Sequence, residues 1–119
     1  MAFKFEKLIV WQKAMDLNEV IFTITKEFPA EERYNLISQM RRAADSVALN
    51  IAEGSTSQSN LEYKRFLNYA IRSLVEVVSA LFIAKRRHYI REDGFQRTYL
   101  QCEGLVKMIQ ALKNKLIIK

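Results

Sequence analysis

The sequence predicts an all-α protein, an antiparallel up-down-up-down four-helix bundle that forms a single domain over residues 1–119. Half of the residues are apolar, and only three Gly and one Pro interrupt the chain, so helix breakers are scarce. Apolar side chains also recur every three or four residues in four successive segments that are separated by short turn-like stretches. A chain of this length buries a core without disulfides or a metal.

The first helix is predicted over about residues 6–27. Lys13, Asp16 and Glu19 lie off a stripe of apolar residues that steps by four and three positions and therefore occupies one face. Trp11 lies beside the stripe, in an apolar helix rather than a basic loop, so we expect it to anchor the core or an interface. The stripe consists of Val10, Ala14, Leu17, Ile21, Ile24 and Phe28.

Pro29 is predicted to end the first helix and to occupy an early position of the second. Glu31 and Glu32 then lie near the positive end of the helix dipole. Gly54 follows the last apolar positions, and we expect it to end the second helix by adopting a positive φ. Several alanines make this helix thin enough for a close neighbour. Its inward residues are Leu36, Met40, Ala44, Val47 and Ile51.

A short Ser/Thr-rich loop, residues 55–59, separates the second helix from the third. Ser59 has Glu62 three residues later, which is the spacing of a capping box, so the third helix is expected to start at once. Such a short loop favours an antiparallel pair of helices. The numbers of residues at the same level then sum to about 114, which places Val47 level with Leu67.

The third helix is predicted from Asn60 to His88 or Tyr89, a length of about 40 Å. It carries a main apolar stripe and a second stripe of mostly small residues. Two stripes suit a helix that is held from two sides, by two bundle neighbours or by one neighbour and another subunit. The main stripe is Leu67, Ala70 or Ile71, Leu74, Val78 and Leu81, and the second is Ser73, Val77, Ala80 and Ala84.

The fourth helix is predicted to begin after Asp93, which is a suitable N-cap with Gln96 three residues on. Cys102 is the only cysteine, so it forms no internal disulfide, and its place in the apolar pattern predicts a small core residue. The inward positions are Tyr99, Cys102, Leu105 or Val106, Ile109, Leu112 and Leu116.

The net charge of +6 is concentrated in the second half of the chain. Residues 1–59 contain 7 Lys and Arg against 8 Asp and Glu, whereas residues 60–119 contain 12 against 5. This bias is typical of a surface that binds nucleic acid, although it also suits a solvated surface. Cations near the C-terminal end of the third helix are also favoured by the helix dipole. The candidate nucleic-acid-binding residues are Lys64, Arg65, Arg72, Lys85, Arg86, Arg87 and Arg91.

The usual groups of an active site are missing from the sequence. His88 is the only histidine and lies on a different predicted helix from Cys102, and there is no phosphate loop, nucleophile elbow or metal-ligand spacing. We therefore predict no enzymatic activity, no cofactor, no metal and no small-molecule substrate. No apolar run of membrane-spanning length and no signal peptide are evident, so we expect a cytoplasmic protein without a membrane.

Several short motifs occur in order along the chain: Leu8, Val10-Trp11-Gln12, Phe28-Pro29, Gln39, Arg41-Arg42-Ala43, Ser46 and Asn50-Ile51-Ala52-Glu53-Gly54. As a set they resemble the small proteins encoded in intervening sequences of bacterial 23S rRNA genes. The resemblance implies a four-helix bundle that assembles as a homopentamer without a known enzymatic activity. We assign to the family motif Arg41, Arg42, Asn50, Glu53, Gly54 and Glu76.

The chain departs from the family pattern at Arg72-Ser73, where members commonly carry Gly-Ser, so the Arg72 side chain is expected to affect close packing at that level. Arg72 has Glu76 four residues later and is expected to pair with it along the helix. Arg41 or Arg42 across the hairpin is expected to reach the same carboxylate, in a buried contact.

Two interpretations stay open for the other motif residues. Arg41 and Arg42 either pair with Asp45 along the helix or form an anion-binding pair. Asn50 and Glu53 likewise have two interpretations. In the first, Asn50 hydrogen-bonds nearby backbone groups and Glu53 forms an ion pair with Lys64 or Arg65. In the second, the two residues form a ligand site beside the Ser/Thr loop.

Two hypotheses for the function follow. The first is a non-enzymatic homo-oligomer, pentameric by resemblance, that binds RNA or DNA through a basic surface. The chain also resembles, more distantly, pentameric accessory proteins of diversity-generating retroelements. Those proteins have nucleic-acid and reverse-transcriptase partners, which supports this hypothesis. The second is a protein-interaction scaffold without a nucleic-acid role. Clustering of the candidate cations on one exposed face favours the first, and dispersal among acidic residues favours the second.

Overall fold

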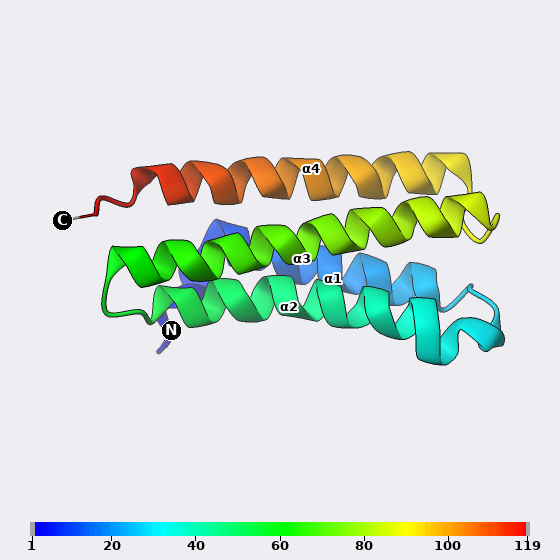
Figure 1. Cartoon of the computed structure of the whole chain (residues 1–119), viewed down its shortest axis with the longest axis horizontal. Helices are drawn as coiled ribbons and strands as arrows, with labels where there is room; N and C mark the ends of the chain where they lie inside the picture. Colours follow the sequence, from blue (N-terminus) through cyan, green and yellow to red (C-terminus); the bar gives the residue numbers. More distant parts are fainter. Residues whose placement is uncertain (1, 119) are drawn as a thin grey trace.

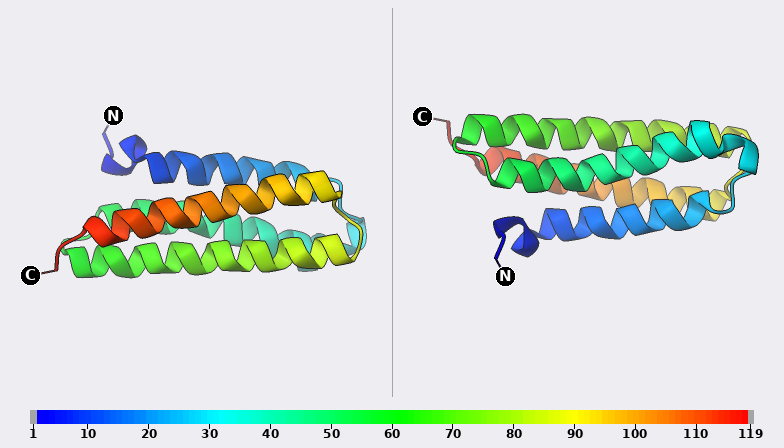
Figure 2. Two further views of the ribbon diagram at one scale, coloured as in Figure 1. Left: turned by 90° about the horizontal axis from the view of Figure 1, so that it is seen from above. Right: turned by 90° about the horizontal axis from the view of Figure 1, so that it is seen from below.

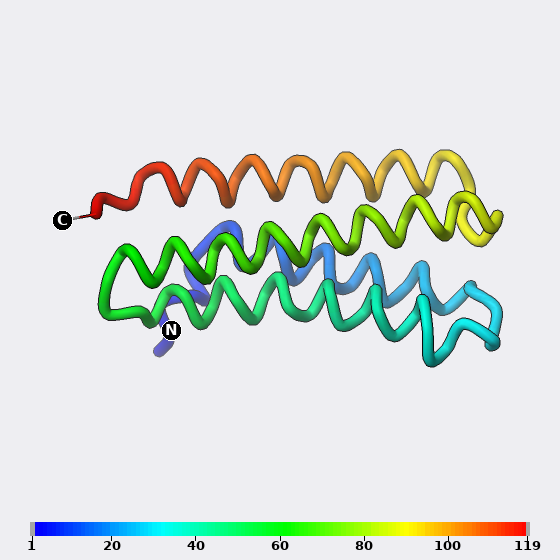
Figure 3. The backbone as a smooth tube through the Cα atoms, viewed as in Figure 1, coloured from blue at the N-terminus to red at the C-terminus, as the bar shows by residue number. Residues whose placement is uncertain are grey.

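The computed structural model describes residues 2–118, which form four long helices and contain no strand. Figure 1 shows the helices running alternately in opposite directions, so the predicted up-down-up-down bundle is confirmed. Both α1–α2 and α3–α4 connections lie at one end of the bundle, and both termini lie at the other end with the α2–α3 loop (Figure 3). The helices are α1 (Ile9–Thr25), α2 (Ser38–Ser55), α3 (Asn60–Arg86) and α4 (Glu92–Lys115).

Each helix packs against two neighbours. Helix α1 contacts α2 and α4, and α3 contacts the same two helices, with the most extensive packing between α2 and α3 (Figure 2). The apolar stripes expected from the sequence meet along the axis of the bundle, where their burial drives helix formation. The largest fully buried apolar side chains are Leu17, Ile21, Met40, Ile51, Leu67, Leu74, Leu81 and Ile109.

The first predicted helix, residues 6–27, is divided and shorter than expected. A 3-10 helix spans Lys4–Lys7, Leu8 is extended with φ −76° and ψ 124°, and α1 begins only at Ile9. The sequence pattern did not show this break because Leu8 is apolar and continues the surrounding pattern. Trp11 is half-buried and packs edge-on against Phe5, with ring centroids 4.9 Å apart.

The connection from α1 to α2 is more irregular than a simple helix start. A 3-10 helix, Ala30–Glu32, follows Pro29 and leads into a π-helix, Arg33–Ile37, before α2 begins. Helix α1 already ends at Thr25, so Pro29 lies outside it. Glu31 and Glu32 lie in the first turn of the 3-10 helix, as expected, but Glu31 is exposed whereas Glu32 is buried.

Gly54 lies within α2 rather than after it. Helix α2 continues to Ser55, and no glycine between residues 2 and 118 has a positive φ, so the predicted helix stop at Gly54 is wrong. The requirement is steric instead. A Cβ at this position would lie 2.8 Å from the Cβ of Phe66 and 3.1 Å from Cδ1 of Tyr63. The missing side chain thus lets α2 and α3 approach each other closely.

The start of α3 agrees with the sequence, but its register against α2 does not. The backbone N–H of Glu62 donates to Ser59 Oγ at 3.1 Å, which confirms Ser59 as the N-cap. Ser73 bonds Ser46 at 3.0 Å and Gly54 faces Phe66, so numbers of facing residues sum to 119 and 120 rather than about 114. Helical side chains lean toward the N-terminus, so a given level is reached by a residue C-terminal to it in both helices, which raises the sum.

Helix α3 ends at Arg86, two or three residues before the predicted end at His88 or Tyr89. His88 has φ 63°, and the next N–H, from Tyr89, donates to Ala84 O at 2.9 Å, which closes the helix with a left-handed residue. Helix α4 begins at Glu92 with Arg91 at the N-cap position, so the prediction of Asp93 as N-cap is wrong.

One described helix, α3, has the length and mean hydropathy of a membrane-spanning segment, 1.5 over its most apolar window. The core helix of a bundle has the same properties, and α3 buries Leu67, Leu74 and Leu81 completely against its neighbours. Its exposed face carries Arg72 and Glu76. The expectation of a protein without a membrane stays a prediction.

Candidate nucleic-acid interface

A hydrogen-bonded cluster joins the α3–α4 turn to the α1–α2 connection. Arg87 Nη1 donates to Glu32 Oε2 at 2.8 Å, and Tyr89 Oη donates to the same oxygen at 2.9 Å. Asn35 Nδ2 donates to Glu32 Oε1 at 3.0 Å. Only 8% of the Glu32 side chain is exposed, so the carboxylate depends on these donors in place of water. We refer to these four residues as the Glu32 cluster.

The donors of the Glu32 cluster favour the ionised carboxylate. The hydrogen bond from Tyr89, followed by the bond from Asn35, holds the pKa of Glu32 below its ordinary value of 4.5. The same bond raises the pKa of Tyr89 above 10.0, since the phenol must keep its proton to donate. Arg87 is therefore part of the architecture of this end, in addition to being one of the predicted nucleic-acid contacts.

Lys85 is also held by neighbours. Its Nζ lies 3.2 Å from Glu92 Oε1 and 4.4 Å from the centroid of the Phe95 ring. A hydrogen bond from Gln96, followed by the bond from Lys85, lowers the pKa of Glu92. These contacts place the ammonium group between α3 and the first turn of α4.

Arg86 and Arg91 differ from Lys85 and Arg87, which are each paired with a glutamate. Both are exposed, and neither forms an ion pair with any residue between 2 and 118. The nearest acidic residues in the sequence, Glu92 and Asp93, already contact Lys85 and Arg97. Two arginines with uncompensated charge thus lie close together in the chain, at the end of α3 and the start of α4.

The remaining candidate cations lie farther along α3. Arg65 and Arg72 are exposed, and Lys64 is half-buried. Arg65 and Arg86 are separated by about 32 Å of helix at 1.5 Å per residue. The seven predicted residues therefore form one group at the α3–α4 turn and a separate series along α3, rather than a single patch.

Arg41 has a structural environment that the sequence did not reveal. Its Nε donates to Thr25 Oγ1 at 2.9 Å and its Nη2 to Phe22 O at 3.3 Å, with the guanidinium 4.2 Å from the centroid of the Phe22 ring. In the described part of the chain, neither Arg41 nor its neighbour Arg42 pairs with Asp45, so that expectation is wrong. The Asp45 carboxylate accepts a hydrogen bond from Asn18 instead.

Asn50 satisfies local groups, as one interpretation expected. Its Nδ2 donates to both Ser46 O and Ser46 Oγ at 2.9 Å. Glu53 is exposed and forms no ion pair with Lys64 or Arg65 among the residues described, so the expected pairing is wrong.

Glu76 lies on the exposed face of α3, which contradicts the prediction of a buried contact with Arg41 or Arg42. No ion pair joins Glu76 to Arg72 within residues 2–118 either. Arg72 is exposed, and Ser73 still bonds Ser46 beside it, so the Arg72 side chain leaves this close approach undisturbed. The departure from the Gly-Ser pattern thus does not prevent close packing.

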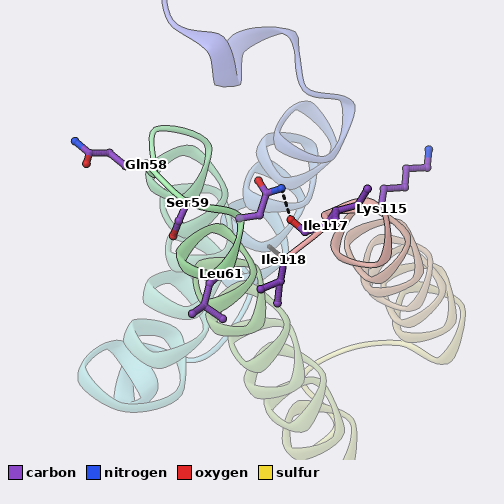
Figure 4. A pocket seen from close by; sticks show the side chains of 7 residues that line it. Gln58, Ser59, Leu61, Lys115, Ile117 and Ile118 are labelled. Carbon is purple, nitrogen blue, oxygen red and sulfur yellow. Dashed lines mark hydrogen bonds between the residues drawn. The ribbon is translucent and has the colours of Figure 1, made fainter.

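A hollow of about 650 Å³ lies at the opposite end of the bundle, between the α2–α3 loop and the segment after α4 (Figure 4). Asn60 Nδ2 donates to Ile117 O at 2.8 Å and closes one side of it. Among the described residues, neither Asn50 nor Glu53 lines this hollow, and Lys115 is its only charged residue. It therefore gathers none of the predicted site residues.

Other predictions concern buried or absent groups. Cys102 is fully buried and unpaired, and burial raises the pKa of its thiol to about 12, as expected of a core residue. Residues 2–118 contain no group of three His, Cys, Asp or Glu side chains placed to hold a metal ion.

The residues that sequence reasoning missed are Glu32, Asn35 and Tyr89. Their partners are up to 57 positions apart in the chain, so no local pattern marks them.

Comparisons with known proteins agree with the fold. A family described as 23S rRNA-intervening sequence protein matches residues 6–111. Among solved structures, one similar chain is a protein of unknown function from the S23 ribosomal protein family of Bacteroides thetaiotaomicron. It is 18% identical, with a TM-score of 0.80, and the match covers 90% of this chain and 100% of that one. No curated protein matches the sequence.

Proposed function

The chain belongs to the family of 23S rRNA-intervening sequence proteins, and from this premise we propose that it is a non-enzymatic homo-oligomer that binds RNA or DNA through the cations around the α3–α4 turn. The observation that carries the proposal is the pair of exposed arginines, Arg86 and Arg91, which have no acidic partner among the described residues. Arginine forms strong charge-assisted hydrogen bonds with phosphate groups, and neutralisation of phosphates by Lys and Arg dominates the affinity for nucleic acids.

The charge around the turn supports the same conclusion. Residues 85–92 contain four Lys and Arg and a single Glu. The Glu32 cluster holds Arg87 in a fixed position, with 47% of its side chain still exposed. A phosphate backbone at this surface would therefore contact positive charges that are already held in position before binding.

Homo-oligomerisation, a pentamer by family resemblance, is supported by the apolar surface that one copy leaves exposed. Val75 and Leu100 are 61% and 59% exposed, on α3 and α4. Exposed side chains of this size on neighbouring helices are typical of a subunit contact. Repetition of the arginine pair around a ring would raise the overall affinity for a nucleic acid through avidity, because several weak phosphate contacts form at once.

Two measurements on the purified protein test the proposal. Sedimentation or light scattering gives the number of copies, and a titration with labelled structured RNA, single-stranded RNA and duplex DNA over a salt series gives the affinity. We expect an oligomer whose affinity falls steeply with salt. A protein that binds none of the probes at low salt would contradict nucleic-acid binding, and a monomer at micromolar concentration would contradict the assembly.

The alternative, a protein-interaction scaffold, has one observation in its favour. An apolar hollow of about 400 Å³ lies between α3 and α4, with Val75, Val78, Phe82 and Val106 among its lining residues. A partner protein could cover it without any nucleic acid. The absence of binding to every probe, with assembly intact, would favour this function.

A further inference from the structure

Two hollows meet at the C-terminal end of α3. One, of about 540 Å³, is lined by Ser79, Phe82, Ile83, Lys85, Arg86 and His88. The second, of about 380 Å³, adjoins it on the side of the α3–α4 turn, and Lys85 and His88 line both. Arg91 lines the second. Because they share two lining residues, the hollows lie side by side, and we refer to the pair as the α3 hollow.

Phe82 is the aromatic ring of the α3 hollow. Half of its surface is exposed, although a ring of this size normally packs inward. Phe95 and Tyr99 fix it from the side, with centroids 5.0 and 6.2 Å away at steep angles of 68° and 83°. The ring is therefore held in place while it stays accessible, as a stacking platform requires.

His88 lies where the two parts of the α3 hollow adjoin. It is the one residue between 2 and 118 with a positive φ, which is 63°, in a region where glycine is the residue without strain. Its side chain is exposed and lines both parts of the α3 hollow. The positive φ closes α3, and the imidazole beside the turn is exposed and able to donate an N–H to an anion.

We propose that the α3 hollow binds a single-stranded segment of RNA or DNA, with a base stacked on Phe82 and the adjoining phosphates at Arg86, His88 and Arg91. This inference rests on the proposed nucleic-acid binding and names its mode. Arg86 and Arg91 donate to phosphate oxygens as charged groups, and the His88 N–H adds a further hydrogen bond. Ile83, which also lines the hollow, offers an apolar contact to the base.

A single strand fits these features better than a duplex. Bases inside a duplex are stacked on each other and present only their edges in the grooves, so an exposed aromatic ring has no base face to contact. A flexible strand can turn a base onto the ring while its backbone follows the cations. Because every base has a stacking face, we expect little dependence on sequence.

The test compares labelled oligouridine, oligothymidine and matched RNA and DNA duplexes by fluorescence anisotropy. Phe82→Leu keeps an apolar side chain but removes the ring, and Tyr69→Leu, which removes another exposed aromatic ring from α3, is the matched control. We expect Phe82→Leu to weaken single-strand binding by about fivefold or more and to leave duplex binding within about twofold. The two single-stranded probes distinguish RNA from DNA.

His88→Gly and His88→Asn separate a binding role from a structural one. Both residues tolerate a positive φ, so the turn is retained. We expect His88→Gly to raise Tm and both variants to weaken single-strand binding. A His88→Gly variant that binds as tightly as the wild type would exclude the imidazole from the site.

Crosslinking of a 4-thiouridine oligonucleotide to the unmodified protein gives an answer that does not depend on any variant. Crosslinks within residues 79–91, read by mass spectrometry, are expected. Crosslinks confined to other segments, equal effects of Phe82→Leu and Tyr69→Leu, or tighter binding of the duplexes would overturn this inference while nucleic-acid binding itself stands. Failure to bind any probe would overturn the proposed function as well.

Discussion

Arg87 Nη1 lies 2.8 Å from Glu32 Oε2, and this ion pair ties the α3–α4 turn to the α1–α2 connection across 55 positions of the chain. Both connections lie at the same end of the bundle, so the pair links them directly, beside the contact between the rings of Phe28 and Tyr89. The cations proposed to contact phosphate, Arg86 and Arg91, lie at this end of the bundle.

The first prediction concerns the charge of Glu32. Glu32→Gln keeps the size of the side chain but removes the negative charge that Arg87 and Asn35 contact, so we expect Tm to fall by several degrees. Glu31→Gln, which removes the same charge from an exposed neighbour, should leave Tm unchanged. Thermal unfolding followed by circular dichroism measures both. Equal Tm values for the two variants would contradict a structural role of the cluster.

The second prediction is a pH dependence with two limbs. The folded pKa of Glu32 lies below 4.5, so its contribution is complete above about pH 4.5 and is lost as the pH falls through the lowered value. The folded pKa of Tyr89 lies above 10.0, so its contribution is present below pH 10.0 and is lost as the pH rises through the raised value. Urea unfolding across pH should show less acid destabilisation in Glu32→Gln than in Glu31→Gln. Identical acid limbs would contradict this assignment.

The third prediction compares two glycines within helices. Gly54→Ala places a Cβ 2.8 Å from Phe66, so we expect a loss of about 1–3 kcal/mol in the free energy of unfolding. Gly104→Ala, in α4, has no atom within 4 Å of the new Cβ and should gain about 1 kcal/mol from helix propensity. Chemical denaturation gives both values. A stabilising Gly54→Ala would show that α2 and α3 do not depend on close approach there.

The fourth prediction separates the two adjacent arginines of the family motif. Arg41→Ala removes hydrogen bonds to Thr25 and Phe22 and the interaction with the Phe22 ring, so we expect the unfolding free energy to fall by about 1–2 kcal/mol. Arg42→Ala, at an exposed position, should change it by about 0.5 kcal/mol or less. Urea denaturation of both variants measures the difference. Equal decreases would mean that the Arg41 interactions contribute little in solution.

Much of the fold could be predicted because it depends on patterns within single helices. The apolar spacing that places Leu17, Leu67 and Leu81 in the core depends on nothing outside each helix, and all three are fully buried. Ser59 was recognisable as a cap because its partner, Glu62, is three residues away.

The parts that could not be predicted depend on distant partners. Glu32 has the local sequence of a solvated helix N-terminus and is buried only because Arg87 and Tyr89 meet it from another turn. The role of Gly54 was mistaken because a steric requirement and a positive φ both select glycine, and only the position of Phe66 distinguishes them. The candidate cations were identifiable by type, but their partners were not.

The measurement that tests the central claim most directly is the salt dependence of nucleic-acid binding by Arg86→Ala/Arg91→Ala. Arg87 is left unchanged because its removal would disturb Glu32. Lys13→Ala/Lys107→Ala removes the same charge from exposed positions on α1 and α4 and serves as the control.

We expect the arginine double variant to keep its oligomeric size, to bind more weakly and to show a salt slope reduced by about 0.7 for each phosphate of a single strand that the protein no longer neutralises. The control should keep the wild-type slope. A double variant whose affinity and slope equal those of the wild type would contradict the claim that these arginines form the nucleic-acid interface.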